Sequence, residues 1–258
     1  IGSEVKDYQW LEWHIGELNV TIENLTEEWG GLLLTGPEAR NVLSQCTQED
    51  LSNNAFSWLS CKTIKIDSAD VFAMRVSYAG ELGWELHMPS WQVISIYESL
   101  FEMGSPLGLK DFGGQAFNSM RLEKMYRAYG AEFTEEISAL EAGMERFLDL
   151  NRDFIGADNI RERMSSGIKT KLAYLIFDDQ VPAECFGNEA VFSDGELTGI
   201  ITSGAYGHRV GHSIAFAYLK TEHCNDGASL TVETSLGSRS CHVSMNASYD
   251  QTNEKLCS

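Results

Sequence analysis

The sequence lacks any apolar run approaching the roughly 18 residues that a membrane-spanning helix needs. It also lacks a surplus of basic residues, because 19 Lys and Arg stand against 38 Asp and Glu and give a formal charge of −19. A charge of that sign repels nucleic-acid backbones and anionic membranes. We therefore expect neither a transmembrane role nor nucleic acid or a membrane as a partner.

Motifs for metals and dinucleotides are missing as well. No Cys-x-x-Cys pair and no Gly-x-Gly-x-x-Gly motif after a strand occurs, so we expect no metal site and no dinucleotide site in this chain. His208 and His212 have a spacing that serves metals on a helix, but the glycines at 207 and 211 favour a loop. The six scattered cysteines are interpreted as ordinary thiols: Cys46, Cys61, Cys185, Cys224, Cys241 and Cys257.

The composition is typical of a soluble globular protein, with 43% hydrophobic and 22% charged residues in a chain of 258, which is long enough for its own core. After Lys169 the sequence changes to short apolar runs separated by Gly, Asn, Asp and Ser, which predicts a small antiparallel barrel or sandwich. The predicted strands are 172–177, 190–192, 199–202, 213–219, 230–232 and 241–245. With Ser165-Ser166-Gly167 as a linker, we expect two domains, 1–168 and 169–258, in an α+β fold.

The first domain mixes strands and helices. An apolar stripe of Ala39, Val42, Leu43 and Cys46 predicts a helix that begins near Thr35–Glu38, where the spacing is that of a capping box. Further helices are expected from Trp91, from Gly114 through Gly130 and over 158–164, and strands over 17–23, 31–34, 71–76 and 84–88.

The segment 75–86 reads Arg-Val-Ser-Tyr-Ala-Gly-Glu-Leu-Gly-Trp-Glu-Leu, an apolar strand, a glycine-containing turn and a second strand. It places Glu85 among bulky apolar neighbours, where a carboxylate is costly unless a partner satisfies it. A ligand edge with two adjacent N–H donors, such as a pterin ring, would suit both oxygens. The alternation of the strand also allows Glu85 to point into water, on the face opposite Trp84 and Leu86.

This segment and four others in order resemble the folate-binding aminomethyltransferase family, which includes the glycine-cleavage T-protein and the C-terminal part of dimethylglycine and sarcosine dehydrogenases. The other segments are 33–40, 121–127, 152–156 and 202–214. The dehydrogenase branch is more similar, because Glu254 follows Gln251-Thr252-Asn253 where cleavage-system members carry a tyrosine. The resemblance implies a T-protein-like folate-binding module, incomplete at its N-terminus, followed by an antiparallel β-barrel.

The resemblance also implies which residues bind folate. Glu85 matches the glutamate that binds the pterin, Tyr78 a tyrosine that lies against the folate, and Arg121 an arginine near the cofactor that suits a carboxylate-bearing tail. Simple packing for Tyr78 and a surface ion pair for Arg121 remain alternatives. Arg75 is expected to be structural.

By the same resemblance we expect tetrahydrofolate-dependent one-carbon transfer. The small-molecule substrate would be an N-methyl amine, dimethylglycine or sarcosine, whose iminium or formaldehyde-level carbon is captured as 5,10-methylenetetrahydrofolate. The family's catalytic aspartate falls before Ile1, and in the dehydrogenases a domain that binds FAD precedes the module. The mitochondrial matrix and the bacterial cytoplasm are both compatible compartments.

Two alternatives to this function stay open. A non-catalytic regulatory or scaffold protein could use the same fold, because a fold does not determine a function. A folate-dependent demethylase that works without a flavin is the other.

Overall fold

The computed structural model describes residues 3–182 and 185–258, which cluster into two compact units. The first unit holds the described residues up to Val76 together with Gly83–Lys110, and the second holds Ser77–Leu82 and Asp111–Ser258. The short segment Ser77–Leu82 thus belongs to the second unit, although the chain on both sides of it belongs to the first. The sequence-based boundary between residues 168 and 169 stays a prediction.

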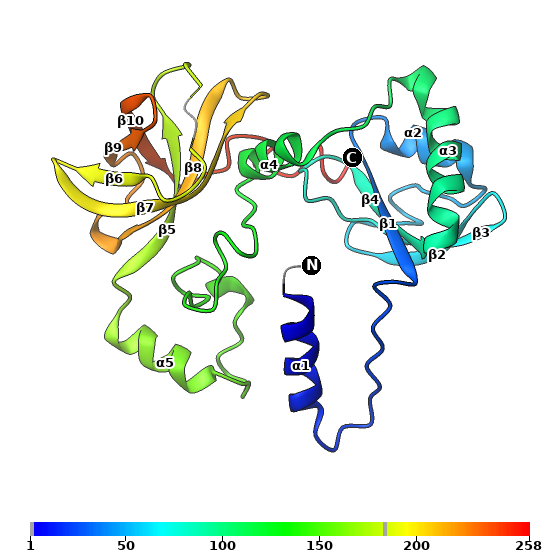
Figure 1. The fold of residues 1–258 in the computed structure, drawn as a ribbon, viewed down its shortest axis with the longest axis horizontal. Coiled ribbons are helices and arrows are strands. Elements are labelled where there is room, and N and C mark those ends of the chain that lie inside the picture. Colours follow the sequence, from blue (N-terminus) through cyan, green and yellow to red (C-terminus); the bar gives the residue numbers. More distant parts are fainter. Residues whose placement is uncertain (1–2, 183–184) are drawn as a thin grey trace. The chain divides into compact units, whose positions relative to one another are not determined.

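The first unit is built on a four-stranded antiparallel sheet with the strand order β1-β4-β3-β2. Helices α2 and α3 lie together over one side of it (Figure 1), and α2 buries the predicted apolar stripe. The predicted pairing of the strands near 71–76 and 84–88 is confirmed. The elements are α1 (Glu4–Ile15), β1 (Trp29–Thr35), α2 (Ala39–Cys46), β2 (Cys61–Ile66), β3 (Ala69–Met74), β4 (Gly83–Pro89) and α3 (Val93–Gly104).

Strand β4 has two faces of opposite character. Trp84, Leu86 and Met88 have no exposed surface, so they belong to the core under the helices. Each such side chain contributes roughly 2 kcal/mol through the burial of apolar surface. Glu85 and His87 alternate with them and lie on the other face of the sheet.

The second unit contains a closed antiparallel barrel with the strand order β10-β5-β8-β7-β6-β9. All six strands predicted after Lys169 are formed, and of the two predicted architectures the barrel is present. Its interior is apolar, with Leu175, Ala217 and Val232 among its buried residues. The strands are β5 (Thr170–Phe177), β6 (Ala190–Ser193), β7 (Glu196–Gly207), β8 (His212–Lys220), β9 (Ser229–Thr234) and β10 (Gly237–Ser244).

Two helices of the second unit precede the barrel, α4 (Gly114–Glu123) and α5 (Ala157–Ser166). Helix α4 packs against β7 and β8, and its Leu122 is buried with Tyr174 and Phe216 in a second apolar cluster. This packing brings the end of α4 to the turn between β7 and β8, where several charged side chains meet.

Some predicted elements differ from those observed. The strand expected over 17–23 is not formed, and Leu18 and Val20 are exposed, because the alternation there has no partner strand. Helix α1 was not predicted, and none of its residues is buried. The helix expected from Gly114 to Gly130 ends at Glu123, and Met125 adopts a positive φ of 56°.

Smaller differences concern helix ends. Helix α2 begins after Glu38, α3 begins at Val93, and Ser165 and Ser166 of the predicted linker lie inside α5. Four short 3-10 helices complete the described elements: Ser90–Gln92, Ser105–Leu107, Glu145–Phe147 and Thr221–His223. Among the residues that the structure describes, no helix has both the length and the apolar character that crossing a membrane would require.

Candidate functional site

Glu85 lies on the side of the sheet opposite α2 and α3. Its cross-strand neighbours are Leu33 on β1 and Met74 on β3, so apolar residues flank it on both adjacent strands. The side chain is 36% exposed, and its nearest ionic partner is His87, with 3.5 Å between Nε2 and Oε2. The carboxylate is therefore neither deeply buried, as the sequence suggested, nor turned away from every neighbour.

A pocket of about 670 Å³ opens beside Glu85 within the first unit. Glu85 and His87 form one wall, Trp29 and Phe72 add aromatic surface, and the other walls come from α1 and residues 22–26. The pocket combines hydrogen-bond acceptors with flat apolar surfaces, which suits a planar ligand that carries N–H donors.

Tyr78 belongs to the second unit and lies among aromatic side chains. Its ring is stacked on Tyr126 with 5.8 Å between centroids and is tilted against Phe117 at 5.4 Å. Its hydroxyl donates a hydrogen bond to the carbonyl oxygen of Arg127. Burial raises the pKa of Tyr78, so this tyrosine is a neutral hydrogen-bond donor at physiological pH.

Arg121 is buried inside α4, with 3% of its side chain exposed. Its Nη1 donates to Oε2 of Glu132 at 2.8 Å and to the carbonyl oxygen of Tyr126 at 2.9 Å, and its Nε donates to Asn118 at 3.0 Å. The sequence left open a surface ion pair for Arg121, but the ion pair that it forms is buried, and the neighbouring Glu123 pairs with another arginine.

The partner of Arg121, Glu132, is a buried carboxylate that the sequence did not single out. It has no exposed side-chain surface. Its Oε2 accepts from Arg121 and from the backbone N–H of Ala128 at 2.8 Å, and its Oε1 accepts from the hydroxyls of Thr202 and Ser203. Every direction around this carboxylate is thus occupied by a protein donor.

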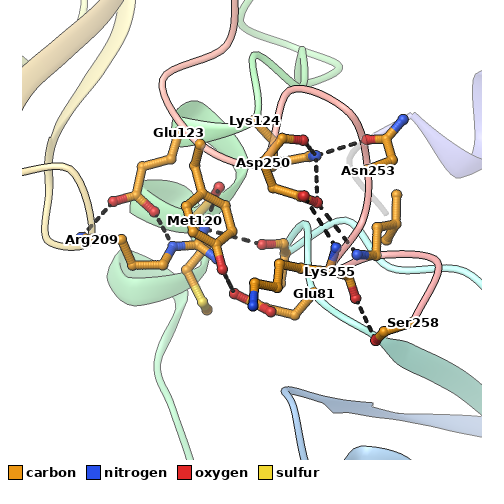
Figure 2. Close-up of polar contacts among 12 residues, drawn as sticks. Glu81, Met120, Glu123, Lys124, Arg209, Asp250, Asn253, Lys255 and Ser258 are labelled. Atoms are coloured by element: carbon orange, nitrogen blue, oxygen red, sulfur yellow. Dashed lines mark hydrogen bonds and ion pairs between the residues drawn. The ribbon is translucent and has the colours of Figure 1, made fainter.

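A second charged network lies at the end of α4 (Figure 2). Arg209, from the turn between β7 and β8, forms ion pairs with Glu123 and, at 2.6 Å, with Glu81. Its guanidinium carbon lies 3.9 Å from the ring centroid of Tyr249, whose hydroxyl donates to Glu81 at 2.6 Å. Burial, together with the hydrogen bond to Glu81, raises the pKa of Tyr249 to about 12.

Lys124, which follows Glu123 at the end of α4, binds the C-terminal segment (Figure 2). Lys124 Nζ donates to the carbonyl oxygen of Asp250 at 2.6 Å, to its carboxylate at 3.2 Å and to Asn253 at 2.7 Å. The ion-pair side chains of Lys124 and Asp250 are 2% and 4% exposed. Glu123 and Lys124 together therefore join the end of α4 to the barrel turn and to the last residues.

A second cavity, of about 690 Å³, lies between α4 and strand β7 in the second unit. Arg121 lines it together with Asn118, Ser203 and Tyr206. Its walls are mainly short polar side chains and small residues, so it offers more hydrogen-bonding groups than aromatic surface.

The two histidines lie at the β7–β8 turn: His208 is in the turn and packs edge-on against Tyr206, and His212 is the first residue of β8. Within residues 3–182 and 185–258, no group of three or more His, Cys, Asp or Glu side chains is arranged to hold a metal ion.

The structure brings Tyr78 and Arg121 into the same unit, and Arg121 is close enough to lower the pKa of Tyr78, against the stronger effect of burial. Glu85 belongs to the other unit. Sequence reasoning missed Glu81, Glu132 and Arg209, and only the sequence position of Glu81, inside the segment that carries Tyr78, offered a signal.

Comparisons with known proteins agree with the resemblance. The model of the GCVT N-terminal domain matches residues 1–152, and that of the Glycine cleavage T-protein C-terminal barrel domain matches residues 171–250. The second range corresponds to the closed barrel. These two matches confirm the sequence-based assignment to this family and the α+β fold with a C-terminal antiparallel barrel.

Individual relatives include mitochondrial dimethylglycine dehydrogenase of Homo sapiens, 39% identical over 237 residues, which are 90% of this chain and 27% of the relative. Mitochondrial sarcosine dehydrogenase of Homo sapiens is 32% identical over 196 residues, 75% of this chain and 21% of the relative. Aminomethyltransferase of Thermoanaerobacter pseudethanolicus is 30% identical over 229 residues, 88% of this chain and 61% of the relative.

A solved structure has the same fold. The crystal structure of the glycine cleavage system aminomethyltransferase T from Bartonella henselae superposes with a TM-score of 0.83 at 21% identity, over 97% of this chain and 67% of that one. The chain spans about a quarter of the length of the dimethylglycine dehydrogenases that it matches, at 27%.

Proposed function

The chain belongs to the glycine-cleavage T-protein family, and we propose that it is a tetrahydrofolate-binding, one-carbon-transferring part of an enzyme of the dimethylglycine or sarcosine dehydrogenase type. The carbon would come from an N-methyl amine at the oxidation level of formaldehyde, and the product would be 5,10-methylenetetrahydrofolate. The identity of 39% with a dimethylglycine dehydrogenase over most of the chain supports this branch of the family. Oxidation of the amine is not assigned to any residue of this chain.

The position of Glu85 carries the proposal. Its carboxylate lines a pocket, its cross-strand neighbours are Leu33 and Met74, and its one ionic partner among the described residues is the imidazole of His87 at 3.5 Å. A carboxylate in that position can accept two hydrogen bonds from one ligand edge. The amino group and the adjacent ring N–H of a pterin form such an edge, so the residues present fit the proposed ligand.

Other residues would position the ligand. Trp29 and Phe72 offer aromatic surface beside Glu85, and the pocket of about 670 Å³ is large enough for a pterin ring. On the family match, Tyr78 would contact the folate with its aromatic ring. Arg121 would meet a carboxylate-bearing tail from the wall of the cavity between α4 and β7, although its Nη1 and Nε are already engaged.

Tetrahydrofolate supplies, when bound, the nitrogen nucleophile that takes up the one-carbon unit. The contribution of the chain is to hold that ligand in one orientation and to limit the access of water to a reactive carbon. Glu85 would fix the rotation of the pterin in its plane, because two hydrogen bonds to one carboxylate define a direction that a single contact does not. A mitochondrial matrix or a bacterial cytoplasm is the compartment that we propose for this chemistry.

The test is tetrahydrofolate binding by the intact protein, measured by calorimetry. Glu85→Gln keeps the shape of the side chain and removes its charge and one acceptor, so we expect at least tenfold weaker binding, about 1.4 kcal/mol. Glu102→Gln is the matched control, because Glu102 is exposed on α3 in the same unit and does not line the pocket. It should bind like the unmodified protein.

Two results would contradict the proposal in different ways. Equal affinity of Glu85→Gln and Glu102→Gln would remove Glu85 from the site. No detectable binding by the unmodified protein would favour the regulatory or scaffold alternative. Turnover of an N-methyl amine in the absence of flavin would favour the flavin-free demethylase.

A further inference from the structure

The segment Ser77–Leu82 is held in the second unit by side chains distant in sequence. Both ends of the segment continue into the first unit, at Val76 and at Gly83. The segment is most of the connection between β3 and β4, residues 75–82, which has no regular structure to fix it, so its position depends on side-chain contacts. Tyr78, which we propose as a ligand contact, lies in this segment.

Arg209 makes two of these contacts (Figure 2). Its Nη1 donates to Glu81 Oε1 at 2.6 Å, and its Nη2 donates to the carbonyl oxygen of Ala79 at 3.3 Å. The two contacts fix the backbone and a side chain of the segment one and three residues after Tyr78. A guanidinium can do both at once because its donors form a planar fork.

Arg209 itself is oriented from two other sides. Glu123 Oε1 accepts from its backbone N–H at 2.8 Å, and the other oxygen of Glu123 accepts from its Nε. The carbonyl oxygen of Met120, also on α4, accepts from its Nη2 at 3.1 Å. The ring of Tyr249 covers the guanidinium, and the side chain of Arg209 is 22% exposed. With this many partners, the guanidinium has one well-defined position.

The same segment is pressed against Lys124 at Gly80. The φ of Gly80 is +74°, and a Cβ built there would overlap Cγ of Lys124. The segment therefore contacts the methylene stem of Lys124 directly, while Arg209 holds the residues on both sides of Gly80.

We propose that Arg209 is a positioning residue for the ligand site at Tyr78, acting through Ala79 and Glu81. The inference rests on the proposed function, and it adds a residue to which neither the family match nor the relatives' names assign a role. Without Arg209, Glu81 loses its cation while still partly buried, and the segment loses two of its fixed points. The ring of Tyr78 then leaves its place against Phe117 and Tyr126 for part of the time.

A positioning role of Arg209 predicts a different result from a role in stabilising the second unit as a whole. If Arg209 acts through Tyr78, its loss should matter for binding only while Tyr78 is present. If Arg209 only stabilises the unit, its loss should affect binding equally with and without the Tyr78 ring. A double-mutant cycle separates the two cases.

The experiment compares Arg209→Met, Tyr78→Ala and the double variant in the intact protein by tetrahydrofolate calorimetry. We expect Arg209→Met to weaken binding at least tenfold, and by less than threefold when Tyr78 is already alanine. The matched control is Arg239→Met, since Arg239 forms an ion pair with Asp179 on the barrel and has no contact with segment 77–82 among those described. This control should leave the affinity unchanged.

A second readout needs no ligand. Amide hydrogen exchange of the peptide covering 77–82 should be at least tenfold faster in Arg209→Met than in Arg239→Met, with the barrel strands equally protected in both. Arg209→Lys can reach one carboxylate but not the whole set, so it should restore part of the protection. If Arg209→Met does not fold, Glu81→Gln removes the charge of the partner alone and should show the same change to a smaller degree.

The outcomes are distinct. Unchanged exchange of 77–82, or additive effects on affinity in the cycle, would overturn the role of Arg209. A lack of tetrahydrofolate binding by the unmodified protein would overturn the proposed function instead, and the exchange comparison would still decide whether Arg209 holds the segment.

Discussion

Glu132 in the second unit and Glu85 in the first are both carboxylates beside apolar residues, but their surroundings differ. Glu132 has no exposed surface and accepts hydrogen bonds from Arg121, Ala128, Thr202 and Ser203. Glu85 is 36% exposed, and within the part of the chain that the structure describes its one ionic partner is His87 at 3.5 Å. The first is saturated by the protein, and the second has acceptor capacity left for a ligand.

This difference separates structural from ligand-binding carboxylates on physical grounds. A buried carboxylate must be paired and hydrogen-bonded, since its desolvation is otherwise too costly. Saturation therefore indicates a role in holding the fold, and it leaves little capacity for a ligand. A carboxylate that lines a pocket with free acceptor positions can change partners at little cost to stability.

The largest expected effect is on stability, from Glu132→Ala. Removing the carboxylate leaves the guanidinium of Arg121 buried without its ionic partner, a change that typically costs about 3–5 kcal/mol. We expect a loss of that size in the free energy of unfolding, measured by urea denaturation of the intact protein. In contrast, Glu85→Ala should change the free energy of unfolding by less than about 0.5 kcal/mol, as is usual for a partly exposed side chain.

The variants Glu132→Ala and Glu85→Ala test whether the two carboxylates have different roles. A loss of similar size for both would mean that Glu85 contributes to the stability of the fold as strongly as Glu132 does. A small loss for Glu132→Ala would mean that the pair with Arg121 contributes little to stability, and that full hydrogen bonding does not identify a structural carboxylate.

The difference between the two carboxylates could be predicted from the sequence only in part. Alternation along a strand is a local signal, so the sequence correctly placed Glu85 on the face opposite Trp84 and Leu86. The six barrel strands were predictable for the same reason, because each is a short apolar run between turn residues. The degree of exposure of Glu85 was not predictable, because it depends on α1 and on the coil after it.

Long-range partners left no local signal. Glu132 meets Ser203 71 residues away, and Arg209 meets Glu81 128 residues away. The early end of α4 has a similar cause, since Glu123 and Lys124 bind the β7–β8 turn and the C-terminal segment, and the chain leaves the helix directly after Glu123. Helix propensity alone predicts a continuation to Gly130, and tertiary contacts override it.

A smaller loss of stability is expected from a substitution in the segment 77–82, which contains Tyr78, and it tests how tightly the second unit holds that segment. Gly80→Ala adds a Cβ to a residue in the left-handed conformation, which costs about 1–2 kcal/mol. The added Cβ also overlaps the side chain of Lys124. Lys124 cannot move away easily, because its Nζ is bound to Asp250 and Asn253. We expect a total loss of about 2–3 kcal/mol in the free energy of unfolding, because strain and overpacking add.

Gly130→Ala is the control for this variant. Gly130 has a φ of +87°, and no described atom lies within 4 Å of the position of its Cβ. It should show the cost of the left-handed conformation alone. Equal losses for Gly80→Ala and Gly130→Ala would mean that the segment moves away from Lys124 freely, which contradicts a tightly held second unit.

The smallest effect concerns acid and the C-terminal segment. Burial opposes the ionisation of Asp250, but hydrogen bonds from the backbone N–H of Lys255 and from Lys124 hold its pKa below the ordinary value of 3.8. A lowered pKa stabilises the folded state above pH 3.8, and this contribution is lost as the pH falls through the folded value. Asp250→Asn should therefore cost about 1 kcal/mol at pH 7, and its difference from the unmodified protein should decrease below pH 3.8 in urea denaturation series. If the difference in free energy of unfolding between Asp250→Asn and the unmodified protein stayed constant well below pH 3.8, the charge of Asp250 would not be what holds the last residues of the chain.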